Sequence, residues 1–153
     1  MNGPDILKRI AVILTVLGLL GQCGGCGEKR SDIERNARSV GAVPRIRPDY
    51  CGLVIPPNIG PLNFIVCEKG DRFFVSISGD SGNRIDILSA DGRIQIPPAQ
   101  WRDALASNTG RALRYTVYAR QGAEWKRFRE FSNRSSLILF PTSFPSSTST
   151  AIR

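Results

Sequence analysis

The chain of 153 residues contains no histidine. Histidine is the usual general base near neutral pH and a common ligand of zinc. Its absence excludes the Ser-His-Asp and Cys-His catalytic constellations, histidine-ligated zinc and the covalent attachment of c-type haem. The chain also has no glycine-rich loop of the Walker or dinucleotide-binding type. The sequence therefore predicts neither a cofactor nor a metal site.

One short motif invites a catalytic interpretation that the composition contradicts. Gly79–Gly82, GDSG, is similar to the nucleophile segment of trypsin-like proteases. Without histidine Ser81 has no base, so we interpret the segment as a turn between two strands. Carboxylates alone can perform acid–base work, and Asp80, Asp86 and Asp91 are close in the sequence. A small envelope enzyme that uses carboxylates is therefore the alternative function.

Acidic residues are few, because 13 Asp and Glu stand against 21 Lys and Arg and leave a net charge of +8. A basic excess often indicates an anionic partner. Here the excess lies mostly in residues 1–47 and 131–153, and 17 of the 21 basic residues are arginines spread singly along the chain. A surface that binds a nucleic-acid backbone has its basic residues clustered instead. We therefore expect no nucleic-acid partner.

The apolar run near the N-terminus is short for a membrane span. Ile10–Gly21, IAVILTVLGLLG, has no charge and follows Lys8 and Arg9. A run of this length measures about 18 Å as a helix, whereas a bilayer core needs about 20 residues. Basic residues, an apolar run and then small residues are typical of a secretory signal. The sequence predicts a signal peptide or lipoprotein anchor over residues 1–26, with an uncleaved membrane-spanning anchor as the alternative.

Two cysteines follow this run directly, in GQCGGCGE at residues 21–28. Small residues ahead of a cysteine, placed after an apolar run, resemble the lipobox of bacterial lipoproteins. The resemblance implies that a lipid is attached at Cys26 or Cys23 and that the chain is exported to the cell envelope. Cys26 follows two glycines and Cys23 follows leucine, glycine and glutamine, so both registers stay open. A redox dithiol needs a helix N-terminus and a zinc site needs a second ligand pair, and the sequence indicates neither.

Residues 27–47 and residues 48–131 differ in composition. Residues 27–47 are polar, charged and poor in aromatics, which predicts a flexible tether. A short helix over Asp32–Arg38 is the alternative for part of it. Residues 48–131 alternate apolar and polar positions in short runs between turn-forming residues. Strands are expected at Cys51–Ile55, Leu62–Cys67, Arg72–Ser78, Arg84–Leu88, Arg93–Ile96, Ala112–Arg120 and Glu124–Phe131, with one short helix at Pro98–Ser107.

Seven short strands with turns rich in glycine and proline predict a mainly β domain over residues 48–131. The expected fold is an antiparallel β-sandwich of immunoglobulin or fibronectin type. Asp91-Gly92 predicts a hairpin between the strands at 84–88 and 93–96. The strands at 51–55 and 62–67 are expected to be antiparallel neighbours, which places Cys51 opposite Cys67. A disulfide between them fits an oxidising envelope, and two free thiols are the alternative.

The body also suggests a family. The segments PDYCGLVIPPNIGPLNFIV, GRIQIPPAQWRDAL and AEWKRF resemble the N-terminal part of bacterial exported proteins that carry TolB/PD40-type β-propeller repeats. The resemblance covers residues 48–130, and its most specific part is Val54–Phe64. It implies an exported, sandwich-like module that acts as a binding or scaffold component of the envelope. It brings no catalytic residues, and this chain departs from the family because it has no propeller.

The last segment, residues 132–153, is rich in serine, threonine and proline and has no acidic residue. This composition predicts a low-complexity tail. The apolar patch Leu137–Phe140 is unusual in such a tail, which favours the interpretation that the chain is a truncated or frame-shifted relative of a longer protein.

The sequence therefore predicts a membrane-tethered, non-catalytic binding or scaffold module of the cell envelope, with a protein or glycan partner. The predicted contact patch consists of Trp125, Lys126, Arg127 and Arg129. Its alternative is an edge strand kept soluble by charge.

Overall fold

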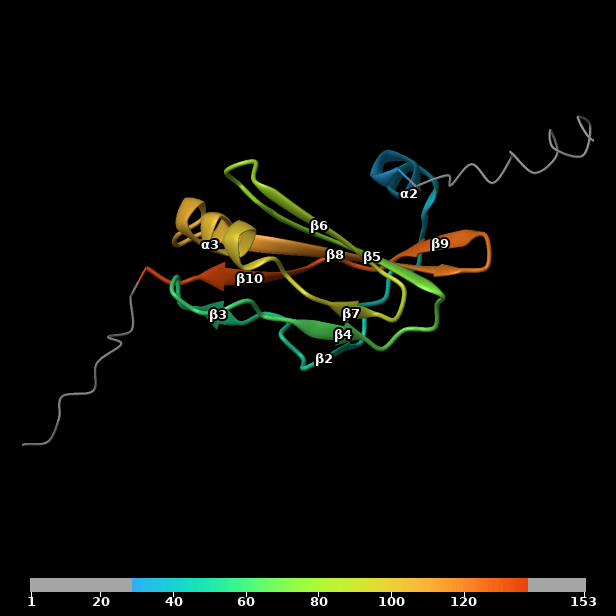
Figure 1. Ribbon diagram of the computed structural model, residues 1–153, viewed down its shortest axis with the longest axis horizontal. Coiled ribbons are helices and arrows are strands. Elements are labelled where there is room, and N and C mark those ends of the chain that lie inside the picture. Colours follow the sequence, from blue (N-terminus) through green and yellow to red (C-terminus); the bar gives the residue numbers. More distant parts are fainter. Residues whose placement is uncertain (1–28, 138–153) are drawn as a thin grey trace, which may run out of the picture. The chain divides into compact units, whose positions relative to one another are not determined.

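The computed structural model describes residues 29–137 (Figure 1). The chain divides into two compact units, Met1–Asp32 and Ile33–Arg153, and both sheets belong to the second. The predicted signal segment with Cys23 and Cys26, and residues 138–153 of the predicted tail, lie outside the described residues. Among residues 29–137, no helix has the length and hydropathy needed to cross a membrane.

The described chain is mainly β, as predicted, and has two helices and ten strands. In chain order these elements are α2 (Arg30–Asn36), β1 (Arg38–Ser39), β2 (Ile46–Arg47), β3 (Val54–Ile55), β4 (Phe64–Val66), β5 (Arg72–Gly79), β6 (Arg84–Ser89), β7 (Arg93–Ile94), α3 (Pro98–Ser107), β8 (Ala112–Gln121), β9 (Glu124–Arg127) and β10 (Phe131–Ser135).

The strands form a seven-stranded sheet and a three-stranded sheet of order β2-β4-β7. Strand β8 is the centre of the larger sheet. It pairs with β5 along one edge, and along the other edge with β9 at one end and β10 at the other. The expectation of a wholly antiparallel fold is wrong at two places, because β1 pairs parallel to β9 and β3 pairs parallel to β10.

The main core lies on one face of the larger sheet, which the small sheet and α3 cover (Figure 1). The alternation predicted for β5 and β8 is confirmed, since every second side chain points into this core. These residues are Phe73, Val75 and Ile77 of β5 and Leu113, Tyr115, Val117 and Ala119 of β8. Burial of one such apolar side chain contributes about 1.5–3 kcal/mol, so this face is the main source of stability.

The opposite face of the larger sheet carries a second, smaller cluster. Ile33 packs there with Phe74, Tyr118 and Trp125. The prediction of a flexible tether over residues 27–47 is therefore wrong from Ile33 onward. Ile33 is buried, β1 pairs with β9, and β2 pairs with β4. The physical reason is that Ile33, a single apolar residue in a polar segment, packs against three aromatic side chains. The polar composition of the segment gave no sign of this contact.

The hairpin predicted between residues 84–88 and 93–96 is also wrong. Strand β6 pairs with β5, and β7 pairs with β4 in the other sheet. The Asp91-Gly92 turn instead carries the chain from one sheet to the other. Gly92 has a φ of 79°, and a Cβ atom there would lie 2.9 Å from the Val66 carbonyl oxygen. The glycine is thus needed where the chain crosses closely from one sheet to the other. In the sequence, an Asp-Gly pair at such a crossing looks the same as one in a hairpin turn.

The predicted domain boundary at residue 131 is wrong as well. Residues Phe131–Ser135 form β10, which lies between β8 and β3 in the larger sheet. Asn133 and Ser135 are both 1% exposed. The Leu53 N–H donates to Asn133 Oδ1 at 3.0 Å. Polar side chains occupy two of the three buried positions of this strand, so its hydropathy pattern did not reveal it.

Candidate functional site

Helix α3 has the bounds that the sequence predicted, Pro98–Ser107. Pro98 suits the first turn, where a helix needs no N–H donor. Trp101, Ala104 and Leu105 are buried and form the face that packs on the core. The helix ends at Asn108, whose N–H donates to the Leu105 carbonyl oxygen at 3.2 Å. Two hollows lie beside α3, one on each side of its buried face.

On one side, the loop between β3 and β4 lies against α3. Trp101 is fully buried, and its indole Nε1 donates to the Ile59 carbonyl oxygen at 3.0 Å. Asn63 Oδ1 accepts from the Ile96 N–H at 2.8 Å, just ahead of the helix. These two bonds fix the loop beside the helix. The groove between the loop and α3 is therefore already formed in the folded protein, and binding does not have to rearrange the loop.

This proline-lined groove has a volume of about 560 Å³. Its lining is mostly apolar, with an asparagine side chain and an arginine as the polar groups. The lining residues are Pro57, Asn58, Ile59, Gly60, Pro61, Pro98, Trp101, Arg102 and Ala106. A volume of several hundred cubic ångströms, apolar walls and a few polar groups are typical of ligand and peptide sites. The loop that forms one wall lies within Val54–Phe64.

On the other side of α3, the β5–β6 hairpin is fastened to the end of the helix. The fully buried Asn108 donates from Nδ2 to Ser81 Oγ at 2.9 Å and to the Ala104 carbonyl oxygen at 2.8 Å. Its Oδ1 accepts from the Ser81 N–H at 3.3 Å. The GDSG segment is a turn, as predicted, and Ser81 serves to anchor the hairpin to α3.

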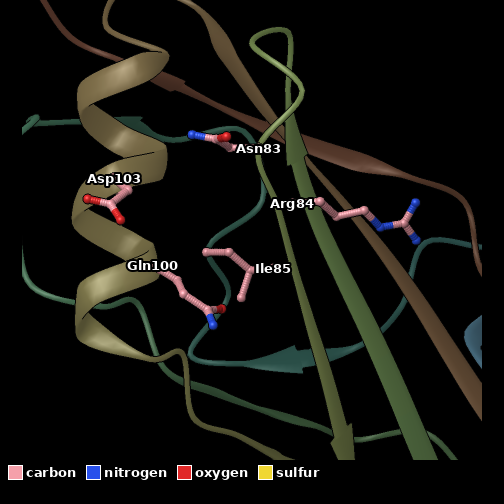
Figure 2. Close-up of a pocket in the computed structure, with 5 residues that line it drawn as sticks. All are labelled: Asn83, Arg84, Ile85, Gln100 and Asp103. Carbon is pink, nitrogen blue, oxygen red and sulfur yellow. The ribbon is translucent and has the colours of Figure 1, made fainter.

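A hollow of about 280 Å³ lies below this anchor, between the hairpin and α3. Figure 2 shows Gln100 and Asp103 on the helix and Asn83 and Ile85 on the hairpin, while Arg84 points away from the helix. Asn83 Nδ2 donates to Ser107 Oγ at 3.0 Å. The hollow is mostly polar, and its side chains come from two elements that already bind one another.

Arg84 points to the outer face of the larger sheet, the face opposite the main core that carries the Ile33 cluster. A third hollow, of about 270 Å³, lies on this face. Its guanidinium forms ion pairs with Asp86, at 2.8 Å, and with Glu34. Burial opposes the charge of Arg84, but the hydrogen bonds to both carboxylates outweigh it and raise the pKa of the guanidinium. The ion pair with Glu34 thus joins the second half of α2 to β6.

The three aspartates considered for acid–base work do not converge on one site. Asp80 pairs with Arg114 at 2.5 Å, and Asp86 pairs with Arg84. The Arg93 N–H donates to Asp91 Oδ1 at 3.0 Å, and this backbone bond lowers the pKa of Asp91. A general acid needs a raised pKa. Within residues 29–137, no three His, Cys, Asp or Glu side chains are grouped closely enough to hold a metal ion.

The four residues of the predicted contact patch do not lie together on the surface. Trp125 is only 6% exposed and belongs to the cluster on the outer face. The Arg120 guanidinium lies 6.0 Å from its ring centroid. Trp125 is therefore buried, and its side chain stabilises the fold.

The three basic residues of that patch point in different directions. Arg127 lies opposite Tyr118 and lines the outer-face hollow. Lys126 lies opposite the core residue Ala119, hence on the other face of the strand, and its Nζ donates to Gln121 Oε1 at 2.8 Å. Arg129 is exposed and follows β9. The four residues therefore do not share one surface.

Cys51 and Cys67 are both free thiols in the structure. The antiparallel pairing expected of their strands is wrong, because β3 belongs to the larger sheet and β4 to the smaller one. Burial, together with a hydrogen bond to Asp49, raises the pKa of the Cys51 thiol to about 11. Cys67 is exposed. The geometric basis of the predicted disulfide is thus absent.

The two thiols are expected to differ in reactivity. The thiolate is the nucleophile, so the raised pKa and partial burial of Cys51 should make it react with iodoacetamide at pH 8 at least about ten-fold more slowly than Cys67. Mass spectrometry of the peptides that contain each cysteine measures the rates. Asp49→Asn should speed the reaction of Cys51 and leave Cys67 unchanged. Equal rates in the unmodified chain would contradict this account.

Comparison with protein families, with curated proteins and with solved structures finds no match to this chain.

Proposed function

We propose that this chain is a membrane-tethered, non-catalytic binding module of the cell envelope, which takes up an extended protein segment in the proline-lined groove. Lipid attachment at Cys26 or Cys23 provides the tether in this proposal. The supporting sequence features are the basic residues, the apolar run and the small residues before each cysteine.

One observation carries the binding part of the proposal, and it is the rigid placement of the groove. The bond from Trp101 Nε1 to the Ile59 carbonyl oxygen ties its two walls together. A preformed site loses less conformational entropy on binding than a loop that must be ordered first. This favours recognition of a partner over a purely structural role for the loop.

A protein segment fits the groove better than a glycan does. Pro57, Pro61 and Pro98 offer apolar rings without N–H donors, and Asn58 and Arg102 are the polar side chains among the lining residues. A glycan presents many hydroxyl groups, each of which needs a hydrogen-bond partner when it is buried. An extended peptide with apolar or proline side chains needs few such partners, and proline-rich segments are commonly bound in this way.

Within this proposal the two sheets form a sandwich of immunoglobulin or fibronectin type, whose connecting loops provide the binding surface. The chain acts as the exported, sandwich-like module that the TolB/PD40-type resemblance implies. The two halves of the proposal, tether and groove, can be tested separately.

The groove is tested by selection from a phage-displayed library of random twelve-residue peptides on the purified full chain. We expect enrichment of apolar and proline-containing sequences. Ala106→Arg, which fills the groove, should weaken binding of the selected peptides at least about ten-fold, a loss of about 1.4 kcal/mol. Ala99→Arg places the same charge on an exposed position of α3 outside the groove and should have little effect. Failure to enrich any sequence, or equal binding by both variants, would refute the groove.

The tether is tested by palmitate labelling in a bacterial host. The unmodified chain should be labelled and should partition into detergent, and the double replacement of Cys23 and Cys26 by serine should abolish labelling. Single replacements identify the modified cysteine. Labelling that survives the double replacement would contradict lipid attachment at these residues.

A further inference from the structure

The last described residues of the chain lie at one end of the proline-lined groove. The Ser136 N–H donates to the Ile55 carbonyl oxygen at 2.7 Å, directly ahead of Pro56. Leu137 lies over Gly110, since a Cβ atom added to that glycine would be 2.9 Å from Leu137 Cδ2. The chain therefore leaves β10 between the start of the loop and the end of α3, at the end of the sheet where Figure 1 shows β3, β10 and α3 together.

These two neighbours continue into the two walls of the groove. The loop wall begins at Pro57, two residues after Ile55, and the helix wall begins at Ala106, four residues before Gly110. From Ala106 to Pro98 the helix rises by about 12 Å. An extended segment of eight residues reaches up to about 26 Å. Residues 138–145 are thus long enough to run the whole length of the groove.

The chemistry of this segment matches the groove. Residues 138–145 read ILFPTSFP and contain no charge. Phe140 and Phe144 each precede a proline, and a residue before proline is biased towards an extended backbone. Leu137, which leads into the segment, is 78% exposed. An extended segment with apolar side chains at its start and at both Phe-Pro steps is the type of occupant that the apolar walls accept.

We propose that residues 138–145 lie in the proline-lined groove of the same molecule and cover it until a partner segment displaces them. The inference deepens the proposed function, and it rests on that function only for the external partner. The segment then acts as an intramolecular competitor, whose effective concentration is set by the short connection through Leu137. The groove of the full chain is accordingly less accessible than its volume suggests.

Photo-crosslinking of the full chain tests this placement. p-Benzoylphenylalanine is introduced at Phe140 or at Phe144, the chain is irradiated, and the crosslinked peptides are identified by mass spectrometry. We expect crosslinks within the monomer to residues 57–61 and 98–106, and few from the same probe at Ile152. Ala106→Arg should reduce the groove crosslinks several-fold. Crosslinks scattered over the surface, or found only in crosslinked dimers, would overturn the intramolecular placement.

A second measurement separates this inference from the proposed function. In the full chain, Phe140→Ser combined with Phe144→Ser should strengthen binding of the library-selected peptides about five-fold or more, and Ser146→Ala combined with Ser147→Ala should not. Crosslinks to the groove with no peptide bound by any variant would refute the external partner and support the tail. Peptide binding that is unaffected by the phenylalanine replacements, without groove crosslinks, would refute the tail and leave the proposed function intact.

Discussion

Replacing Gly79 by alanine is expected to destabilise the fold by about 2–3 kcal/mol, which lowers the melting temperature by about 10 °C. A Cβ atom at this position would lie 2.2 Å from Asn108 Oδ1. The Asn108 side chain cannot move away cheaply, because it is fully buried and its amide makes three hydrogen bonds to Ser81 and Ala104. Displacing it leaves buried polar groups unpaired, and each costs about 1–3 kcal/mol. Thermal unfolding followed by circular dichroism measures the effect.

The control for this substitution is Gly60→Ala. Nothing lies within 4 Å of a Cβ atom added there, and Gly60 does not adopt a positive φ. The melting temperature of that variant should change by no more than about 2 °C. Asn108→Ala removes the atoms that clash, so the double variant of Gly79 and Asn108 should lose less stability than the sum of the two single variants. Full additivity would show that the clash is not the cause.

The sequence predicted well those elements whose pattern is local. The period of two in β5 and β8, and the spacing of Trp101 and Leu105 in α3, are properties of a few adjacent residues. Because the apolar residues of these elements also form the main core, hydropathy and burial agree there. The mainly β class followed from the same signal.

The pairing of strands could not be predicted in the same way. Strands β1, β2, β3 and β7 each contain two residues, which is too short to show a period. The parallel pairing of β3 with β10 joins residues about 80 positions apart. Asp91-Gly92 has the residues of a hairpin turn but joins two sheets, since a turn sequence fixes local backbone geometry and does not select the partner of the next strand.

The sequence indicated the two walls of the groove but not the contact between them. The segment Val54–Phe64 and the helix with Trp101 both stood out, each for its own pattern. Two hydrogen bonds fix them side by side, one from the Trp101 indole to the Ile59 carbonyl oxygen and one from the Ile96 N–H to Asn63 Oδ1. Each uses a backbone group, which carries no residue-specific signal. Conversely, Trp125 looked like a surface residue because charged residues surround it in the sequence, although its ring packs against Phe74 and Tyr118.

Strand β10 leads to the second prediction, which concerns two truncations. A chain that ends at Leu137 is expected to fold, with a melting temperature within a few degrees of that of the full chain, because it keeps every described strand. A chain that ends at Ser132 is expected to lose cooperative unfolding. Amide hydrogen exchange at β8 and β3 measures the difference, since both strands pair with β10.

The large effect of the shorter truncation has a structural cause. It removes Asn133, whose Oδ1 accepts from the Leu53 N–H, and Arg134, whose N–H donates to the Leu53 carbonyl oxygen at 2.9 Å. It also removes the N–H groups of Ser135 and Ser136, which bond to Arg111 and Ile55. Half of one edge of β8 then loses its partner, and β3 is no longer held in the sheet. Several backbone bonds at about 1 kcal/mol each amount to a large part of a typical stability of 5–15 kcal/mol.

Two single replacements in the full chain distinguish this cause from a general effect of truncation. Asn133→Ala leaves the Leu53 N–H without its acceptor and should cost about 1–3 kcal/mol, measured by urea unfolding. Ser132→Ala, at an exposed position of the same strand, should cost less than about 0.5 kcal/mol. If the chain ending at Ser132 unfolds as cooperatively as the chain ending at Leu137, β10 contributes little to the fold. Equal losses in the two replacements would show that the buried asparagine is not what holds β3 beside β10.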